Sequence, residues 1–217
     1  MNALIAAVAL VGCKKPPEAP TELNELAGYV FEHFMDEDTG ELAAGIDNMD
    51  TWIHSNVDAT AEGYTVDNLD ESVIDSVDPD REHDLDSLGG ASVAFISGFA
   101  VAPIAKTLVL QEQEVVFPKS YDVHDREFLT ETSCFMSHEC DFVDTDNEVE
   151  ASYGGLGMSI KVTTHSRAQF RWIQYGDPEK WALVHRTWLL DQAEVSMDGV
   201  DVKEQLYVGV MPQDGSR

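Results

Sequence analysis

Residues 168–190 read AQFRWIQYGDPEKWALVHRTWLL, and this stretch decides the fold class. Its two ends are rich in β-branched and aromatic side chains, which favour β-strands. Between them, YGDPEKW (175–181) carries the glycine and proline that are typical of a turn. The stretch therefore predicts two neighbouring antiparallel strands.

Similar strand-like segments lie on both sides of this pair. They are TLVLQEQEVVF (107–117), MSIKVTT (158–164) and DVKEQLYVGVM (201–211). The pair Asp198–Gly199, just before the last segment, is the strongest hairpin signal in the chain. We expect an antiparallel meander of at least three strands in the C-terminal third.

An uncharged run, SLGGASVAFISGFAVAPIA, occupies residues 87–105. Its length suggests a membrane span, but three glycines, two interior serines and Pro103 dilute its apolar character. We interpret it as two buried strands that bend near Ala102 and Pro103.

Two amphipathic helices are expected before this run. In residues 21–36 and again in residues 42–53, apolar side chains recur at helical spacing. They are Leu23, Leu26, Ala27, Val30 and Phe34 in the first helix, and Leu42, Ile46, Met49 and Ile53 in the second. Gly45 weakens the second pattern. The expected fold class is α+β: a mainly antiparallel sheet, which could curl or close into a barrel, with one or two N-terminal helices.

The chain is strongly acidic, with 41 Asp and Glu against 13 Lys and Arg and a net charge of −28. This balance excludes nucleic-acid binding, because phosphate contacts need clustered positive charge. Its 43% hydrophobic content fits a folded domain, which we place at residues 21–217, with an acidic loop around 67–86.

Two acidic stretches, DPDREHDLD (78–86) and DTDNEVE (144–150), carry carboxylates at alternate positions, as calcium loops do. Both lack the glycine at the required position of an EF-hand loop, where His83 and Val149 stand instead. We interpret both stretches as solvated acidic segments and expect no metal and no cofactor.

The segment MNALIAAVALVGCKKPPEAP (1–20) has the pattern of an export signal followed by a tether. Its uncharged run is too short to span a bilayer but matches the apolar core of a signal peptide. The residues Leu10 to Cys13 resemble the lipobox of bacterial lipoproteins. That resemblance implies a signal peptide at 1–12, lipid on Cys13, a proline-rich tether at 13–20 and attachment to the membrane. Lys14, directly after the cysteine, implies the outer membrane.

Cys134 and Cys140 remain if Cys13 carries lipid. In an exported protein, two remaining cysteines favour a disulfide. A metal site that adds His138 is the alternative, although the spacing fits no common zinc pattern.

No nucleophile elbow, phosphate-binding loop or zinc-binding helix motif is present in the sequence. The histidines and tryptophans of the predicted strands are expected as core or cross-strand partners. Arg167, Arg171 and Arg186, on adjacent predicted strands, are candidate contacts for an anion or other ligand, or else partners of nearby acids.

The sequence thus favours a lipid-anchored envelope protein with a non-catalytic binding or structural role. One alternative is a carrier of a hydrophobic ligand, with residues 88–105 lining a cavity that the N-terminal helices close. The less favoured alternative is a hydrolase or metal-dependent enzyme. It would require two or more of His124, His138, His165 and His185 to meet a carboxylate in one cleft.

Overall fold

The structure is a computed structural model. It describes residues 18–56, 73, 77, 88–95, 101–111, 121–155, 158–197, 202 and 204–213. The predicted signal peptide, lipobox and most of the predicted tether lie outside these residues, as does the predicted acidic loop around 67–86 apart from two valines. Of those two, Val73 is buried in the core and Val77 packs against it.

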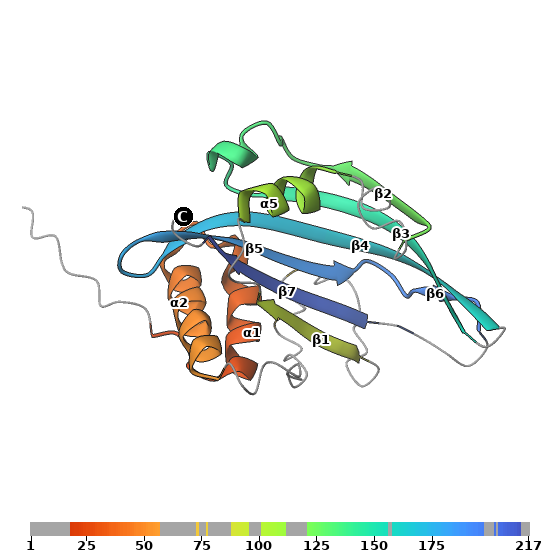
Figure 1. The fold of residues 1–217 in the computed structure, drawn as a ribbon, viewed down its shortest axis with the longest axis horizontal. Helices are drawn as coiled ribbons and strands as arrows, with labels where there is room; N and C mark the ends of the chain where they lie inside the picture. Colours follow the sequence, from red (N-terminus) through yellow and green to blue (C-terminus); the bar gives the residue numbers. More distant parts are fainter. Residues whose placement is uncertain are drawn as a thin grey trace, which may run out of the picture.

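The described elements form a six-strand path with helices on both faces (Figure 1). In chain order they are α1 (Leu23–Glu32), the 3-10 turn η1 (His33–Met35), α2 (Gly40–Ser55), β1 (Leu88–Phe95), α5 (Val101–Leu110), β2 (Val123–Phe128), the 3-10 turn η3 (Phe135–Ser137), β3 (Val143–Gly155), β4 (Met158–Tyr175), β5 (Lys180–Leu189), β6 (Glu194–Val195) and β7 (Glu204–Pro212).

The strand order is β1-β7-β5-β4-β3-β2. The short β6 pairs with the N-terminal part of β4, at Val162 and Thr163. All neighbours are antiparallel except β1 and β7, which run parallel. The sheet is open, with β1 and β2 at its edges, so the predicted α+β class is confirmed and closure into a barrel is not observed.

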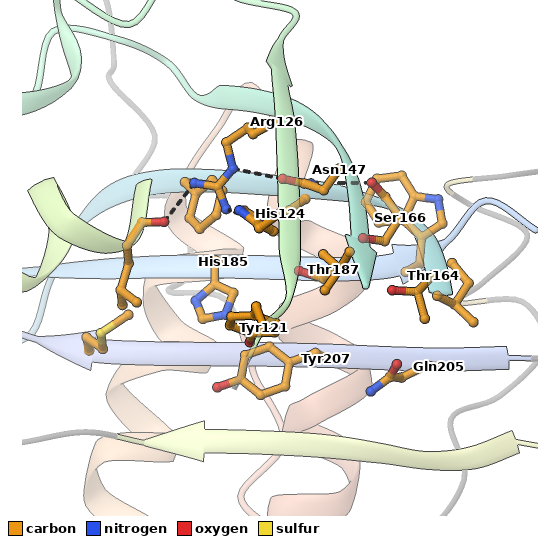
Figure 2. A pocket seen from close by; sticks show the side chains of 17 residues that line it. Tyr121, His124, Arg126, Asn147, Thr164, Ser166, His185, Thr187, Gln205 and Tyr207 are labelled. Atoms are coloured by element: carbon orange, nitrogen blue, oxygen red, sulfur yellow. Dashed lines mark hydrogen bonds between the residues drawn. The ribbon is translucent and has the colours of Figure 1, made fainter. Parts of the chain in front are cut away.

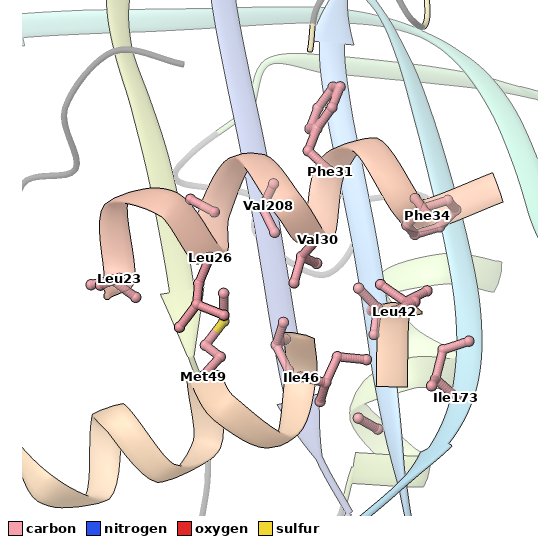
Figure 3. Close-up of a cluster of buried hydrophobic side chains, with 14 of the residues drawn as sticks. Leu23, Leu26, Val30, Phe31, Phe34, Leu42, Ile46, Met49, Ile173 and Val208 are labelled. Carbon is pink, nitrogen blue, oxygen red and sulfur yellow. The ribbon is translucent and has the colours of Figure 1, made fainter. Parts of the chain in front are cut away.

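Alternation along the strands gives each face of the sheet its own apolar core. Ile173 of β4 and Val184 of β5 face α1 and α2, whereas Trp172 and Leu183, one residue earlier, face α5. Successive side chains on a strand point to opposite faces, so the long β4 serves both cores. Figure 3 shows α1 and α2 packed on the first face.

The two N-terminal helices are confirmed, and Gly45 is the residue that lets them approach. A Cβ atom at Gly45 would lie 2.9 Å from a ring carbon of Tyr29 and 3.2 Å from a methyl carbon of Val30. The glycine therefore permits close contact between α1 and α2 at the expense of helix propensity.

The prediction of strand in residues 101–110 is wrong, because these residues form helix α5. Val101, Ala105 and Val109 are buried at a spacing of four, which places them on one helix face. Pro103 lies in the first turn, where its missing N–H leaves no hydrogen bond broken. The rest of segment 107–117 beyond Gln111 lies outside the described residues.

The interpretation of DTDNEVE (144–150) as a solvated segment is also wrong, because it lies within β3. Asp144 is buried against Arg167, and Asp146 accepts a hydrogen bond from His165 on the neighbouring strand. Cross-strand partners therefore stabilise these acids in the sheet.

The hairpin signal Asp198–Gly199 lies outside the described residues, although Ala193 and Val202 form an antiparallel bridge on either side of it. Among the described residues, no helix has both the length and the apolar character needed to cross a membrane.

Candidate functional site

A cavity of about 460 Å³ lies on the α5 face of the sheet (Figure 2). Apart from Trp188, the strand residues that line it alternate along neighbouring strands, as the two-residue period of a strand requires. The described lining residues are Leu108 of α5; Tyr121, His124 and Arg126 of β2 and the residues before it; Asn147 and Val149 of β3; Thr164, Ser166, Ala168 and Phe170 of β4; His185, Thr187, Trp188 and Leu189 of β5; and Gln205, Tyr207 and Met211 of β7.

Arg126 extends over the cavity from edge strand β2. Its Nη1 donates hydrogen bonds to the carbonyl oxygens of Leu108 and Val109, at 2.8 and 2.7 Å, near the end of α5. Its Nε donates to Asn147 Oδ1 at 2.8 Å. Its Nη2 lies 3.5 Å from Nε2 of His124, whose side chain is buried. Burial lowers the pKa of Arg126 to about 10, so the side chain remains charged at neutral pH.

His185 forms the floor of the cavity. Its ring stacks between Phe170 and Tyr207, with centroid distances of 5.5 and 4.7 Å. It lies directly over Gly209 of β7, where a Cβ atom would come within 2.1 Å of the ring. Burial, and then the charge of Arg126, lower the pKa of His185 to about 4, so the ring is neutral at pH 7. Its Nδ1 is shielded from solvent and has no hydrogen-bond partner among the described residues.

A second hollow of about 460 Å³ continues from the first along the sheet. Tyr121, Val149, Thr164 and Gln205 line both. The residues that line the second hollow alone are mainly apolar: Ala151, Tyr153, Val162 and Val202. Together the two hollows form a trough with Arg126 at one end and valines at the other.

The trough differs from the predicted cavity in what encloses it. Helices α1 and α2 pack on the opposite face of the sheet and contribute no lining residue. Residues 101–105 of the run 88–105, which begin α5, line neither hollow.

The three arginines predicted as ligand contacts bind groups of the protein itself and lie outside the trough. Arg167 pairs with both carboxylate oxygens of Asp144, at 2.6 and 2.8 Å. Arg171 donates to the carbonyl oxygens of Phe34 and Asp36, and Arg186 donates to that of Phe31. Their contact with an anion stays a prediction, whereas Arg126 is the arginine that faces a cavity.

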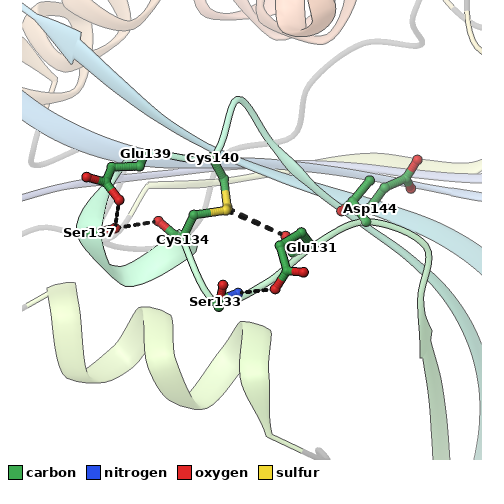
Figure 4. The surroundings of a disulfide bond; sticks show 8 residues. Glu131, Ser133, Cys134, Ser137, Glu139, Cys140 and Asp144 are labelled. Carbon is green, nitrogen blue, oxygen red and sulfur yellow. Dashed lines mark hydrogen bonds between the residues drawn. A yellow bond between two sulfur atoms is a disulfide. The ribbon is translucent and has the colours of Figure 1, made fainter.

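The predicted disulfide between Cys134 and Cys140 is confirmed, with Cα atoms 5.1 Å apart (Figure 4). Its short loop rests on the sheet through His138, which adopts a positive φ of 61°. The imidazole of His138 packs between Trp172 and Trp181, at centroid distances of 4.3 and 4.4 Å. Burial among these rings lowers the pKa of His138.

The four histidines named as a possible enzyme centre therefore separate. His124 and His185 share the cavity, His138 belongs to the disulfide loop, and His165 bridges Asp146 and Asp191 on the sheet. Burial opposes protonation of His165, but hydrogen bonds to the two carboxylates outweigh it and raise its pKa. Within the described ranges, no three His, Cys, Asp or Glu side chains are grouped to hold a metal ion.

Arg126 is the site residue that the sequence reasoning missed, whereas His185 was named only in the less favoured enzyme hypothesis. Arg126 is the only Lys or Arg between Lys119 and Lys161, and it stands two residues after His124. In a strand, that spacing places both side chains on one face. This spacing is a signal of a shared face only if residues 123–128 form a strand, and their charged sequence, VHDREF, does not predict one.

Comparisons of the chain with protein-family models, curated proteins and solved structures find no match.

Proposed function

We propose that this chain is a non-catalytic binding protein, attached to the cell envelope through lipid on Cys13, whose folded domain holds a small, partly apolar molecule. The observation that carries the proposal is the cavity on the α5 face, whose volume of about 460 Å³ lies in the range of ligand sites. Its walls combine apolar side chains with hydroxyl and amide groups, a mixture that both buries a ligand and fixes its orientation.

Binding fits this cavity better than acid–base catalysis does. A general base works best when its pKa lies near the working pH and a partner orients it. The pKa of His185 is about 4, and none of the described lining residues is a carboxylate that could orient either histidine. These features support a role in which the rings contact a ligand without exchanging protons with it.

We expect the full-length protein to bind the neutral apolar dye N-phenyl-1-naphthylamine saturably, measured by dye fluorescence. Thr164 lines both hollows, so a tryptophan there fills their junction. Thr164→Trp should weaken dye binding roughly tenfold or more, because the bulky ring excludes the ligand. The matched control is Thr163→Trp, whose side chain points to the opposite face. Equal affinities of the two variants, or no saturable binding by the unsubstituted protein, would contradict the proposal.

The membrane part of the proposal rests on the lipobox resemblance of residues 10–13. In cells grown with labelled palmitate, the unsubstituted protein should carry label and fractionate with membranes, because several acyl chains together anchor a protein stably. Cys13→Ala should abolish the label and release the protein from the membrane fraction. Cys134→Ala serves as the control, since that residue lies in the disulfide. Label that persists in Cys13→Ala would refute lipid attachment at this residue.

A further inference from the structure

The lining of the cavity contrasts with the charge of the whole chain. Of 217 residues 41 are acidic, and the net charge is −28. Among the described lining residues none is acidic, and Arg126 is the single Lys or Arg. A positive side chain in an enclosure without carboxylates favours an anionic ligand over a neutral or cationic one.

The contacts of Arg126 leave one nitrogen of its guanidinium, Nη2, available. Both hydrogen bonds of Nη1 go to carbonyl oxygens at the end of α5, which Arg126 thereby caps. Nε donates its hydrogen bond to Asn147. A guanidinium has five N–H donors, and Nη2 carries two of them. Nη2 approaches only His124 Nε2 at 3.5 Å, and no carboxylate of the described residues pairs with Arg126. A helix-capping role therefore does not explain why Nη2 faces the cavity.

His185 adds a second polar contact at the same end. The ring is neutral, so one nitrogen carries a proton that it can donate and the other can accept. Its Nδ1 is shielded and has no partner among the described residues, and a buried polar atom in that state is destabilising. Because Nδ1 is shielded, Nε2 is the ring nitrogen that can donate to a ligand oxygen, and this contact leaves the charge of the ring unchanged.

The described residues at the opposite end of the trough carry no charge. Val162 and Val202 lie there beside Ala151 and the ring of Tyr153. Apolar surface of this kind binds hydrocarbon through the hydrophobic effect. The two ends therefore match a molecule with an anionic head and an apolar chain.

We propose that the trough binds an elongated monocarboxylate, with its carboxylate at Arg126 Nη2 and His185 and its apolar chain extending past Thr164 to Val162 and Val202. This proposal rests on the proposed binding function and specifies its ligand class. The two N–H groups of Nη2 suit one carboxylate, whereas a phosphate would bring more negative charge into an already negative protein.

The test compares ligands that differ only in the head group. The full-length chain with Cys13→Ala carries no lipid of its own to compete for the trough. Decanoate, methyl decanoate and decyl phosphate are each titrated against bound N-phenyl-1-naphthylamine. Decanoate should displace the dye at about one tenth of the concentration that the methyl ester requires, because a charge-assisted hydrogen bond contributes about that factor. Equal potency of acid and ester, or higher potency of decyl phosphate, would overturn the proposal.

Two variants locate the carboxylate. Arg126→Gln should remove the preference for decanoate over its ester, and thermal unfolding would report whether α5 is still held. His185→Phe keeps a ring between Phe170 and Tyr207 but cannot donate, so it should reduce decanoate affinity several-fold and leave the ester unaffected. An unchanged preference in His185→Phe and in folded Arg126→Gln would contradict the assigned position. If the dye itself does not bind, the proposed function fails, whereas dye binding without acid preference defeats only this inference.

Discussion

Gly209→Ala should lower the free energy of unfolding by about 3 kcal/mol, because the new methyl group would occupy the space of the His185 ring. An ideal Cβ at this position lies 2.1 Å from His185 Cε1 and 2.5 Å from Nδ1. The ring cannot move aside freely, since Phe170 and Tyr207 stack on it. Relief of the clash must therefore disrupt this stack or shift β7 against β5.

The cost should depend on His185, which a double-mutant cycle can measure. In a His185→Ala background, Gly209→Ala should cost less than about 1 kcal/mol, giving a coupling of at least about 2 kcal/mol. Chemical unfolding of the four proteins provides the values. Gln205→Ala, at an exposed position of the same strand, controls for alanine in β7. The same cost of Gly209→Ala in both backgrounds would show that the ring does not require this glycine.

The sequence predicted helices and strands correctly in segments where a single pattern of apolar residues, helical spacing or a continuous run, is clear. In α1 and α2 the apolar residues follow the helical period, and every predicted core residue is buried except Ile53, which is half-buried, although Phe34 lies in η1. The prediction omitted Gly28, Phe31, Gly45 and Asp50, which are also buried. In β5, Leu183 and Val184 are both buried because each face of the sheet is covered. A continuous apolar run with aromatic residues is then a reliable strand signal.

The errors arose where local composition opposed the tertiary structure. The small and β-branched residues of 101–110 suit a strand, yet they form α5 because packing on the sheet selects the helical face of Val101, Ala105 and Val109. Acidic residues disfavour strands, but those of 144–150 gain partners on β4 only after the sheet has formed.

The cavity was harder to predict than the fold, because it depends on how separate strands align. Arg126 and His185 are 59 positions apart in the sequence and meet only through the order of β2, β3, β4 and β5. Without a strand assigned to 123–128, the shared face of His124 and Arg126 could not be recognised. Arg167, Arg171 and Arg186 lie on segments whose composition predicts strands, so the sequence pattern indicates them rather than Arg126.

Those arginines have a different role, and Arg186 shows it most clearly. Its side chain is buried in the core under α1, with the guanidinium 4.8 Å from the ring centroid of Phe34 and 5.1 Å from that of Phe31. It donates a 2.6 Å hydrogen bond to the Phe31 carbonyl oxygen, in the last turn of α1. A cation at the C-terminal end of a helix interacts favourably with the helix dipole. Arg186 therefore joins the sheet to α1 by charge as well as by packing.

Arg186→Ala should accordingly lower the free energy of unfolding by about 4 kcal/mol, since it creates a cavity among the rings and leaves the Phe31 carbonyl oxygen without its donor. Arg186→Met should cost only about 1–2 kcal/mol, because methionine refills the space and removes the buried charge, while the carbonyl still loses its partner. Lys161→Ala, which removes an exposed cation paired with Glu150, is the control and should cost about 1 kcal/mol or less. Denaturant unfolding measures all three. If Arg186→Ala proved no more destabilising than Lys161→Ala, the guanidinium would not be holding α1 on the sheet, and Arg186 would again be available as a candidate ligand contact.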